Sequence, residues 1–387
     1  MKKVCSFIIL FAVCYLGLPA QGIITGDLRT EKYIPLLNGK KVAVFSNSTG
    51  MAGDKHVVDV LVENGVDVKA IFAPEHGFRI KADAGELVDN EVDDRTGIPI
   101  FSLYGGNKKT SLKEKLTPYD VVVVDIQDVG LRYYTYYVTM YKIMNACAEI
   151  GNQVIILDRP NPNGFYVDGP ILDMKYKSGV GGLPIPIVHG MTLGELGLMI
   201  NGEYWLDGFR RCKLTVVPCL NYTHQSRYKL PVPPSPNLPN MKSVYLYSSL
   251  CFFEGTCVSL GRGTDAPFQM YGHPAMKGYS FSFVPHSVAG AKNPPLLGQI
   301  CYGVDLRNMP DKEIWKKGVN LEYVIDAYKS VGIGDKFFRN FFELLVGVDY
   351  VRPMIEEGKS AKEIKACWKS DVKKFKRQRK PYLLYKE

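Results

Sequence analysis

The sequence predicts an α/β fold with a parallel, doubly wound sheet, followed by a second, smaller α/β domain. Apolar, strand-like segments alternate with helical ones through the first half of the chain, an order typical of parallel sheets with helical crossovers. One segment, "DVVVVDIQD", is almost continuously apolar, as expected of a strand buried on both faces. The chain has 387 residues, which is more than one core usually needs, so two domains are expected.

The expected elements of the first half follow a regular order. Strands are predicted where apolar and β-branched residues cluster, and helices where apolar residues recur every three or four positions. The expected strands are residues 40–47, 66–73, 98–104, 120–128 and 153–162. The expected helices are residues 55–64, 111–116 and 133–151. These elements make up the first domain, which we place at residues 21–170.

The second half, residues 171–387, is less regular and forms the expected second domain. A proline-rich segment at residues 230–240 predicts a stiff, polyproline-like loop. Strands are expected at residues 183–190, 212–220, 279–288 and 299–307, with a strand and turn at 257–268. Helices are expected at residues 191–205, 243–256, 320–331 and 336–347, and in the basic tail.

Residues 1–20 predict a secretory signal peptide. Two lysines follow the first methionine, an apolar stretch of signal-peptide length comes next, and Ala20 offers a small residue for cleavage. Leu18 is not the small residue preferred two places earlier, which leaves the cleavage position open. Cys14 ends only a weak lipobox, "FAVC", so a lipoprotein is not expected. We therefore expect a protein secreted across the inner membrane into the periplasm.

The charge of the chain is modestly positive. The formal net charge is +9, and removal of Lys2 and Lys3 with the signal peptide lowers it by two. Six of the eight residues from Lys373 to Lys380 are basic, and such a run can touch an anionic polymer or a membrane surface. We interpret the run as the solvated face of the last helix. Neither a nucleic acid nor a stable membrane partner is expected.

The cysteines do not predict a disulfide framework or a metal site. Nine cysteines fall to seven after signal cleavage, an odd number at irregular spacing, and several lie in apolar segments as buried free thiols do. Export permits disulfides, and Cys212 with Cys219 or Cys251 with Cys257 are conceivable pairs, but neither is expected. No CxxC motif or Cys/His ladder suggests zinc.

Ionisable residues follow several of the expected strands directly. In open α/β sheets, ligands bind outside the carboxyl ends of the strands, so these side chains are expected at one edge of the sheet. Their convergence is a stronger signal than any single motif. The residues in this position are Glu75, His76, Asp125, Gln127, Asp128, Asp158 and Arg159, with Arg132 and Tyr133 close behind.

Each of these residues also has a structural interpretation. Glu75 could cap the following turn, and Asp125 could bind backbone amides in its own loop. Asp158 and Arg159 could form an ion pair. For a single residue the two interpretations are balanced, and for the whole set we favour a functional one.

Several kinds of site are poorly supported by the sequence. There is no GxGxxG after the first strand, no P-loop, no GxSxG elbow and no HExxH. No cofactor is therefore expected. Carboxylate chemistry remains, and glycoside hydrolysis requires a carboxylic acid to protonate the leaving oxygen. Glu75 suits this role because its apolar neighbours Phe72, Ala73 and Phe78 favour the neutral form of a carboxyl group.

Six motifs in order resemble the exo-β-N-acetylmuramidase family, glycoside hydrolase family 171, formerly a domain of unknown function. They are "PEHGFR", "DIQDVGLRYYTY", "DRPNPNG" followed by "DGP", "SPNLP", "FEGT" and "GRGTDAPF". The resemblance covers about residues 24–386 and implies a Rossmann-like first domain, a second domain and an active-site cleft between them. It implies release of N-acetylmuramic acid from the non-reducing end of peptidoglycan fragments.

The resemblance also implies site residues. The family's catalytic glutamate falls on Glu75, with Asp125 or Glu254 as the second carboxylate unless the acetamido group of the substrate attacks its own anomeric carbon. The lactyl carboxylate of the sugar would be gripped by Arg132, Arg159 or Arg262. The substrate-binding candidates are His76, Arg79, Arg132, Tyr133, Asp158, Arg159, Asn163, Arg262 and Thr264.

Three positions depart from the family pattern. Ile80 stands where glycine is frequent, Leu260 where glutamate is common, and Gln269 where glutamate is usual. The match is looser in the second domain, so the exact substrate can differ. Two further functions stay open: a non-catalytic periplasmic protein that binds sugars or cell wall, and an amidase or esterase acting on wall fragments.

Overall fold

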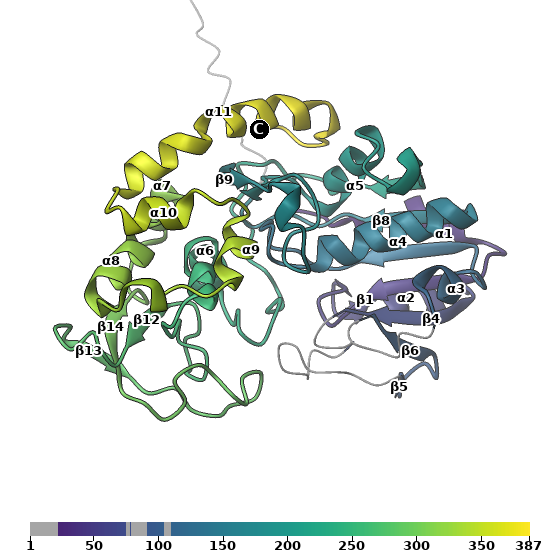
Figure 1. Cartoon of the computed structure of the whole chain (residues 1–387). Helices are drawn as coiled ribbons and strands as arrows, with labels where there is room; N and C mark the ends of the chain where they lie inside the picture. Colours follow the sequence, from purple (N-terminus) through teal and green to yellow (C-terminus); the bar gives the residue numbers. More distant parts are fainter. Residues whose placement is uncertain (1–21, 75–77, 79–90, 104–109) are drawn as a thin grey trace, which may run out of the picture.

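The structure is a computed structural model that describes residues 22–74, 78, 91–103 and 110–387 (Figure 1). Glu75, His76 and Arg79 lie outside the described residues, as does the expected signal peptide. Within the described ranges, no helix is long and apolar enough to cross a membrane.

A seven-stranded sheet forms the centre of the first part of the chain. Its order is β11-β8-β7-β1-β4-β6-β5, and all neighbours are parallel except β5 and β6. Numbered along the chain and read from β6, the parallel strands have the order 3-2-1-4-5-6 of Rossmann folds. This confirms the predicted α/β class. The strands are β1 (Val42–Ser46), β4 (Val68–Ala73), β5 (Glu91–Val92), β6 (Pro99–Ser102), β7 (Val121–Asp125), β8 (Gln153–Leu157) and β11 (Lys213–Val217).

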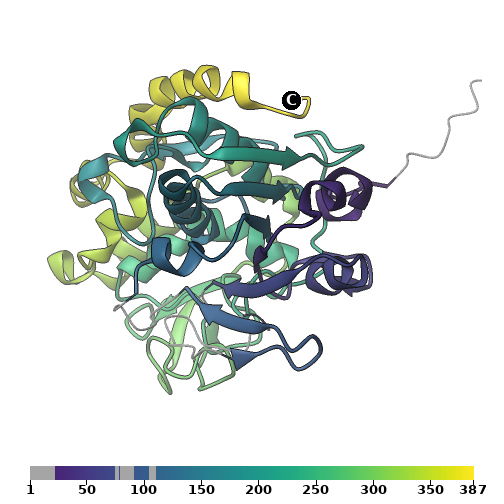
Figure 2. The ribbon, with the colours of Figure 1, turned by 90° about the vertical axis from the view of Figure 1, so that its right-hand side faces the viewer.

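Helices cover both faces of this sheet (Figure 2). On one face, α1 and α2 pack against side chains such as Val44 and Val123. On the other, α3, α4 and α5 pack against Phe45 and Val124. All residues of β1 and β7 are buried, as expected of strands between two helical layers. The helices are α1 (Thr30–Leu37), α2 (Val57–Glu63), α3 (Leu112–Leu116), α4 (Tyr136–Ile150) and α5 (Leu193–Gly202).

The second part of the chain combines helices with a three-stranded antiparallel sheet of order β12-β14-β13 (Figure 1). Its core is continuous with the α4 face of the large sheet. The strands are β12 (Met270–His273), β13 (Phe281–Phe283) and β14 (Cys301–Asp305). The helices are α6 (Met241–Leu250), α7 (Asp311–Lys317), α8 (Glu322–Val331), α9 (Phe341–Val346), α10 (Val351–Glu356) and α11 (Ala361–Arg379). Two small antiparallel pairs complete the fold: β2 (Met51–Ala52) with β3 (Lys55–His56), and β9 (Asp168–Ile171) with β10 (Pro186–Val188).

The last helix and the tail behind it connect the two parts. Near the start of β9, Asp168 accepts hydrogen bonds from the Trp368 indole at 2.9 Å and from the Lys365 ammonium at 3.0 Å, both on α11. Beyond α11, the Tyr385 hydroxyl donates to Asp158 at 2.5 Å, next to the end of β8. The C-terminal segment therefore returns to the first part of the molecule (Figure 1).

The large sheet extends beyond residue 170, where we expected the first domain to end. That residue lies within β9, which pairs with β10, and the later strand β11 pairs in parallel with β8. Because strands on both sides of residue 170 belong together, this position does not separate the sheet from the rest of the chain.

Two other expectations can be compared with the structure. The strand expected within 257–268 is wrong, because the backbone turns at Gly261 and Gly263, which have φ of +83° and +81°. All seven cysteines of the described residues are free thiols, so neither conceivable disulfide forms in the structure.

Candidate active site

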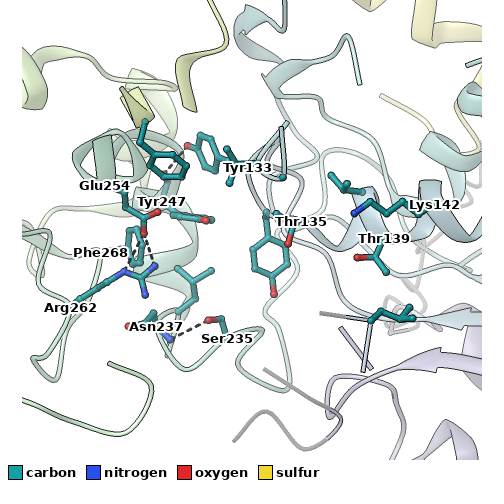
Figure 3. A pocket seen from close by; sticks show the side chains of 17 residues that line it. Tyr133, Thr135, Thr139, Lys142, Ser235, Asn237, Tyr247, Glu254, Arg262 and Phe268 are labelled. Atoms are coloured by element: carbon teal, nitrogen blue, oxygen red, sulfur yellow. Dashed lines mark hydrogen bonds and ion pairs between the residues drawn. The ribbon is translucent and has the colours of Figure 1, made fainter. Parts of the chain in front are cut away.

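A pocket of about 340 Å³ lies between α4 and the second part of the chain (Figure 3). Small-molecule sites usually have volumes of about 300–1,000 Å³. One wall comes from the residues before α4 and from its first turns, Tyr133 to Lys142. The opposite wall comes from α6, from the short 3-10 helix η4 (Cys251–Gly255) and from the turn after it. The proline-rich loop contributes Ser235 and Asn237.

An ion pair between Glu254 and Arg262 is the main charged feature of the second wall (Figure 3). The Arg262 guanidinium donates to Oε1 of Glu254 from Nη2 at 2.5 Å and from Nε at 3.1 Å. Both bonds end on Oε1, which leaves Oε2 without a hydrogen-bond partner among the described residues. Both side chains are half-buried, so the pair can be reached from the pocket.

Glycines in the "FEGT" and "GRGT" motifs allow the backbone to bring Glu254 and Arg262 together. A Cβ on Gly255, directly after Glu254, would lie 2.4 Å from the backbone of Phe342 on α9, so only glycine permits this approach. Gly263 has a φ of +81°, and a Cβ there would lie 2.5 Å from the carbonyl oxygen of His286. The "FEGT" and "GRGT" segments therefore need their glycines to bring Glu254 and Arg262 together.

Aromatic rings form the floor beneath the ion pair. The Tyr247 ring packs edge-on against Tyr133 and Phe268, with centroids 5.1 Å and 4.7 Å apart. The Arg262 guanidinium lies over Phe268 at 5.2 Å, a cation–π distance. Burial raises the pKa of Tyr133 and Tyr247 well above the usual value, so both hydroxyls stay protonated. The Tyr133 hydroxyl is used within the fold, because it donates to the backbone carbonyl of Tyr247 at 2.9 Å.

The proline-rich loop is held against the start of α4 by tyrosine hydroxyls. Tyr134 and Tyr136 both donate to the carbonyl oxygen of Pro234, at 2.7 Å and 3.2 Å. On the other side, the Asn237 amide donates to the carbonyl of Gly290 at 2.8 Å. These bonds fix the loop as a rigid wall of the pocket.

The α4 wall carries hydroxyl groups and one ammonium group. Thr135, Thr139 and Lys142 are spaced by four and three residues, so they share one face of the helix. Figure 3 shows them across the pocket from Glu254 and Arg262. The two walls therefore present different chemistry, with a neutralised ion pair on one side and a single cation on the other.

Asp125 and Arg159 lie away from this pocket, in a buried ion network. Arg159 donates to Asp125 at 2.6 Å and 3.0 Å and to Asp27 at 2.7 Å. Burial and the neighbouring Asp125 raise the pKa of Asp27 to about 6, although Arg159 opposes the shift. Asp125 and Arg159 were expected to meet the substrate, but here their charged groups bind each other and show almost no surface.

Asp158 also serves the fold in this structure. Its carboxylate accepts bonds from the Thr192 hydroxyl at 2.7 Å, the Gly194 amide at 2.8 Å and the Tyr385 hydroxyl at 2.5 Å. Burial raises its pKa to about 6, opposed by the bonds from Tyr385 and Thr192. It caps the start of α5 and ties down the C-terminal tail, whereas we expected it to contact substrate.

Arg132 is fully buried, and both of its Nη atoms are taken by backbone carbonyls, while its Nε has no partner among the described residues. Its Nη1 donates to Pro170 and Ile185 at 2.7 Å and 3.1 Å, and its Nη2 donates to Leu345 and Val346 at 2.9 Å and 2.7 Å. A guanidinium held in this way cannot also grip a substrate carboxylate. Arg132 instead connects the β9–β10 region to α9, which corrects the role that the resemblance implied.

The two remaining candidates, Asn163 and Thr264, lie outside the pocket, one in the core and the other at a separate hollow. Asn163 is buried, and its amide donates to the carbonyl of Val129 at 2.9 Å. Thr264 donates to the carbonyl of Gly261 at 2.7 Å, inside the turn that carries Arg262, and lines a separate hollow beside β13. Of the candidates within the described residues, only Tyr133, Glu254 and Arg262 line the pocket.

Two family models match the chain in succession. "Exo-beta-N-acetylmuramidase NamZ, N-terminal" matches residues 42–242, and the corresponding C-terminal model matches residues 245–385. The chain belongs to the exo-β-N-acetylmuramidase NamZ family. By this membership it is a glycoside hydrolase, which confirms the family that its motifs resemble.

Individual relatives agree with the NamZ assignment. The peptidoglycan β-N-acetylmuramidase NamZ of Bacillus subtilis (strain 168) is 36% identical over 384 residues, which is 93% of this chain and 90% of that protein. A crystal structure of a DUF1343 family protein (BF0379) from Bacteroides fragilis NCTC 9343 has 62% identity and a TM-score of 0.88, covering 95% of this chain and 99% of that one. A second DUF1343 protein of that organism, BF0371, has 28% identity and a TM-score of 0.79, covering 94% and 99%.

Sequence reasoning missed several residues of this NamZ pocket. Ser235, Asn237 and Phe268 lie inside the quoted "SPNLP" and "GRGTDAPF" motifs, which was a usable signal. Thr139 and Lys142 lie in a helix whose apolar periodicity predicts only core packing, so nothing in the sequence singles them out. Among the described residues, no group of three His, Cys, Asp or Glu side chains could hold a metal ion.

Proposed function

We propose that this chain is an exo-acting muramidase that releases N-acetylmuramic acid from the non-reducing end of peptidoglycan fragments. The observation that carries the proposal is that residues of "DIQDVGLRYYTY", "SPNLP", "FEGT" and "GRGTDAPF", far apart in sequence, line one pocket. The named activity of the Bacillus subtilis relative supports this substrate class. A pocket, unlike an open groove, suits the end of a glycan chain.

Glu75 is proposed as the general acid and base. Its place in the chain supports this role, because β4 ends at Ala73 and Pro74 directly precedes the glutamate. The carbonyl of Ala73 accepts a hydrogen bond from the backbone N–H of Leu103 at 2.9 Å, and Leu103 lines the pocket. The strand that leads to Glu75 therefore ends beside the pocket wall.

In the proposed reaction, Glu75 gives its proton to the glycosidic oxygen as the bond to the anomeric carbon breaks. The remaining sugar of the fragment leaves as an alcohol, and a water oxygen then completes the new hydroxyl group after losing its proton to Glu75. Either the substrate's acetamido oxygen or a carboxylate assists at the anomeric carbon.

Glu254 is proposed to orient the sugar. Arg262 balances its charge through two bonds to Oε1, so the carboxylate is already engaged by the protein on that oxygen. Oε2 is free among the described residues to accept a hydrogen bond from a sugar hydroxyl. The aromatic floor of Tyr247 and Phe268 then contacts the apolar face of the ring.

The setting is proposed to be the periplasm, because residues 1–20 have the charge and apolar pattern of a secretory signal. Wall fragments would reach a protein exported to that compartment. N-terminal sequencing of the protein purified from the periplasm of its host should then begin near Gln21.

The test is mass spectrometry of N-acetylmuramic acid–β-1,4–N-acetylglucosamine incubated with wild type, Glu75→Gln and Glu63→Gln. Glutamine is nearly isosteric with glutamate but cannot act as the acid, so Glu75→Gln should slow release by about 10²-fold or more. Glu63, on the exposed side of α2, is the control and should leave the rate unchanged.

Three other outcomes would contradict the proposal. If wild type and Glu75→Gln release the sugar equally fast, Glu75 is not the acid. If wild type binds the disaccharide without cleaving it, the chain is a binding protein. If peptide-bearing fragments lose peptide while the glycosidic bond stays intact, it is an amidase.

A further inference from the structure

The cations of the pocket are not equally available to a substrate. A muramic acid ring carries a lactyl carboxylate, and its recognition calls for a positive group that no protein carboxylate already holds. Arg262 is the lining residue that the sequence suggested, but its guanidinium is bound twice by Glu254. The pair is close to neutral, so it offers little net attraction to an anion.

The other two arginines suggested for this role, Arg132 and Arg159, are not available to a substrate in the pocket. The two Nη atoms of Arg132 donate to four carbonyl oxygens, and Arg159 is held by Asp27 and Asp125. Both side chains are buried outside the pocket. Releasing either one would leave buried polar groups unpaired, which costs more than a new ion pair returns.

Lys142 is the pocket-lining cation that no carboxylate holds within the described residues. It lies on the second turn of α4 and is exposed, and none of its contacts is an ion pair or hydrogen bond to a described residue. The closest acidic residue on its own helix is Glu149, which pairs instead with Lys113 and Arg210, at 3.2 Å and 3.5 Å. Figure 3 shows the amino end of Lys142 directed into the pocket, towards Glu254 and Arg262.

The hydroxyls beside Lys142 extend the same polar face. Thr139 precedes it by three residues and Thr135 by seven, so the three side chains follow one line along α4. Thr135 precedes the first residue of α4 and makes no side-chain cap bond to the helix. Two hydroxyls and an ammonium group in a row can bind a carboxylate and the ether oxygen next to it.

We propose that Lys142 binds the lactyl carboxylate of the substrate and so selects N-acetylmuramic acid over N-acetylglucosamine at the non-reducing end. This inference rests on the proposed function, since it assigns the acidic group of that substrate to one wall of the pocket. In this arrangement the lactyl group of the sugar faces α4, and the free hydroxyl groups of the sugar face Glu254. Lys142 is a specificity-determining residue and takes no part in the proton transfers.

The experiment compares two substrates in wild type, Lys142→Met and Lys142→Arg. One is the disaccharide N-acetylmuramic acid–β-1,4–N-acetylglucosamine, and the other is its lactyl methyl ester, which removes the charge and adds one methyl group. Wild type should cleave the free acid with a kcat/KM about tenfold higher than the ester, the size expected of one partly exposed charged contact. Lys142→Met should lose this preference through a higher KM for the acid, with kcat little changed, and Lys142→Arg should keep most of it.

Lys376→Met is the matched control, because it removes an exposed positive charge on α11 that does not line the pocket. It should keep the acid-to-ester ratio of wild type. If Lys142→Met keeps that ratio as well, or loses kcat instead of raising KM, the inference is wrong while cleavage by wild type leaves the proposed function standing. Absence of cleavage by wild type would instead overturn the proposed function.

Discussion

Two carboxylate–arginine sites of this molecule look alike in sequence and differ in what surrounds them. Arg159 joins Asp27 and Asp125 in the interior, where the side chains of all three are at most 3% exposed. Arg262 joins Glu254 at the pocket, where the side chains are 19% and 22% exposed. In the first site all four carboxylate oxygens accept hydrogen bonds from protein groups, whereas in the second Oε2 of Glu254 has no partner among the described residues.

The hydrogen bonds that a charged group already makes within the protein, more than its residue type, decide whether an ion pair is structural or can bind a ligand. The carboxyl ends of β7 and β8 present ionisable groups, as the chain pattern predicts, but there the fold uses them to anchor its own N- and C-terminal segments. The groups left for a ligand come from the loops and helices around the pocket. Two pairs of substitutions test this contrast, and a fifth substitution tests a buried carboxyl group that lies in neither site.

The largest effect is expected for Arg159→Met. The substitution leaves Asp27 and Asp125 buried next to each other without a cation, which should lower the free energy of unfolding by about 3–5 kcal/mol. Denaturant unfolding followed by circular dichroism measures it. The matched variant Arg262→Met leaves a half-exposed Glu254 that water can solvate, so its loss should stay below about 1 kcal/mol. Equal losses in the two variants would show that the two ion pairs do not differ as described.

Glu254→Gln should act on activity and not on stability. Glutamine keeps an oxygen for Arg262 but loses the charge, so the guanidinium and the sugar are held less firmly, and kcat/KM should fall about tenfold to a hundredfold. That corresponds to about 1.4–2.7 kcal/mol of transition-state binding.

The control for Glu254 is Glu343→Gln. Glu343 pairs with Arg352 at 2.6 Å with side-chain exposures of 20% and 24%, close to those of the pocket pair. It does not line the pocket, so kcat/KM should stay at the wild-type value. A similar loss of activity in both variants would remove the distinction that we draw for Glu254.

A smaller effect is expected for Asp128→Asn and depends on pH. Asp128 is buried, its Oδ1 accepts from the Gly130 amide at 2.7 Å, and its Oδ2 has no hydrogen-bond partner among the described residues. Burial raises its pKa from 3.8 to about 7. The folded state thus holds this proton over a range where the unfolded state has lost it, and the wild-type stability should fall as pH rises from about 4 to about 7.

Asparagine removes this titration, so Asp128→Asn should flatten that part of the stability profile by about 1 kcal/mol or more. Asp27 and Asp158 have pKa values raised to about 6 and keep a part of the slope in the variant. Thermal melting of both proteins between pH 4 and pH 8 measures the difference. A profile of the variant parallel to that of wild type would contradict the assignment.

The fold could be predicted to a large extent from the sequence. The buried strands β1, β4, β7 and β8 and the helix α4 have periodicities that depend only on local burial, and they lie where expected. The position of β11 in the same sheet could not be foreseen, because pairing with β8 joins segments about sixty residues apart. The segment with the turn at Gly261 and Gly263 was predicted as a strand because its neighbouring residues are apolar. The sequence does not show that both glycines adopt a positive φ.

The candidate site was only partly predictable. Glu254 and Arg262 came from motif resemblance and line the pocket, whereas Arg132 and Asp158 came from the same resemblance and from their positions behind strands, and do not line it. The roles of Arg132 and Asp158 depend on bonds to carbonyls, amides and hydroxyls that are distant in sequence. No local sequence pattern predicts such bonds. Lys142 was not predicted, because what distinguishes it is the lack of a carboxylate partner among the described residues, and a sequence does not show which lysines are unpaired.

The most direct test is a crystal structure of Glu75→Gln with uncleaved N-acetylmuramic acid–β-1,4–N-acetylglucosamine. Our account predicts that the muramic acid ring lies in the pocket over Tyr247 and Phe268, with its lactyl carboxylate within hydrogen-bond distance of the Lys142 ammonium and a ring hydroxyl on Oε2 of Glu254. A sugar bound at the buried Asp125–Arg159 network, or in the hollow beside Thr264 with this pocket empty, would contradict the account.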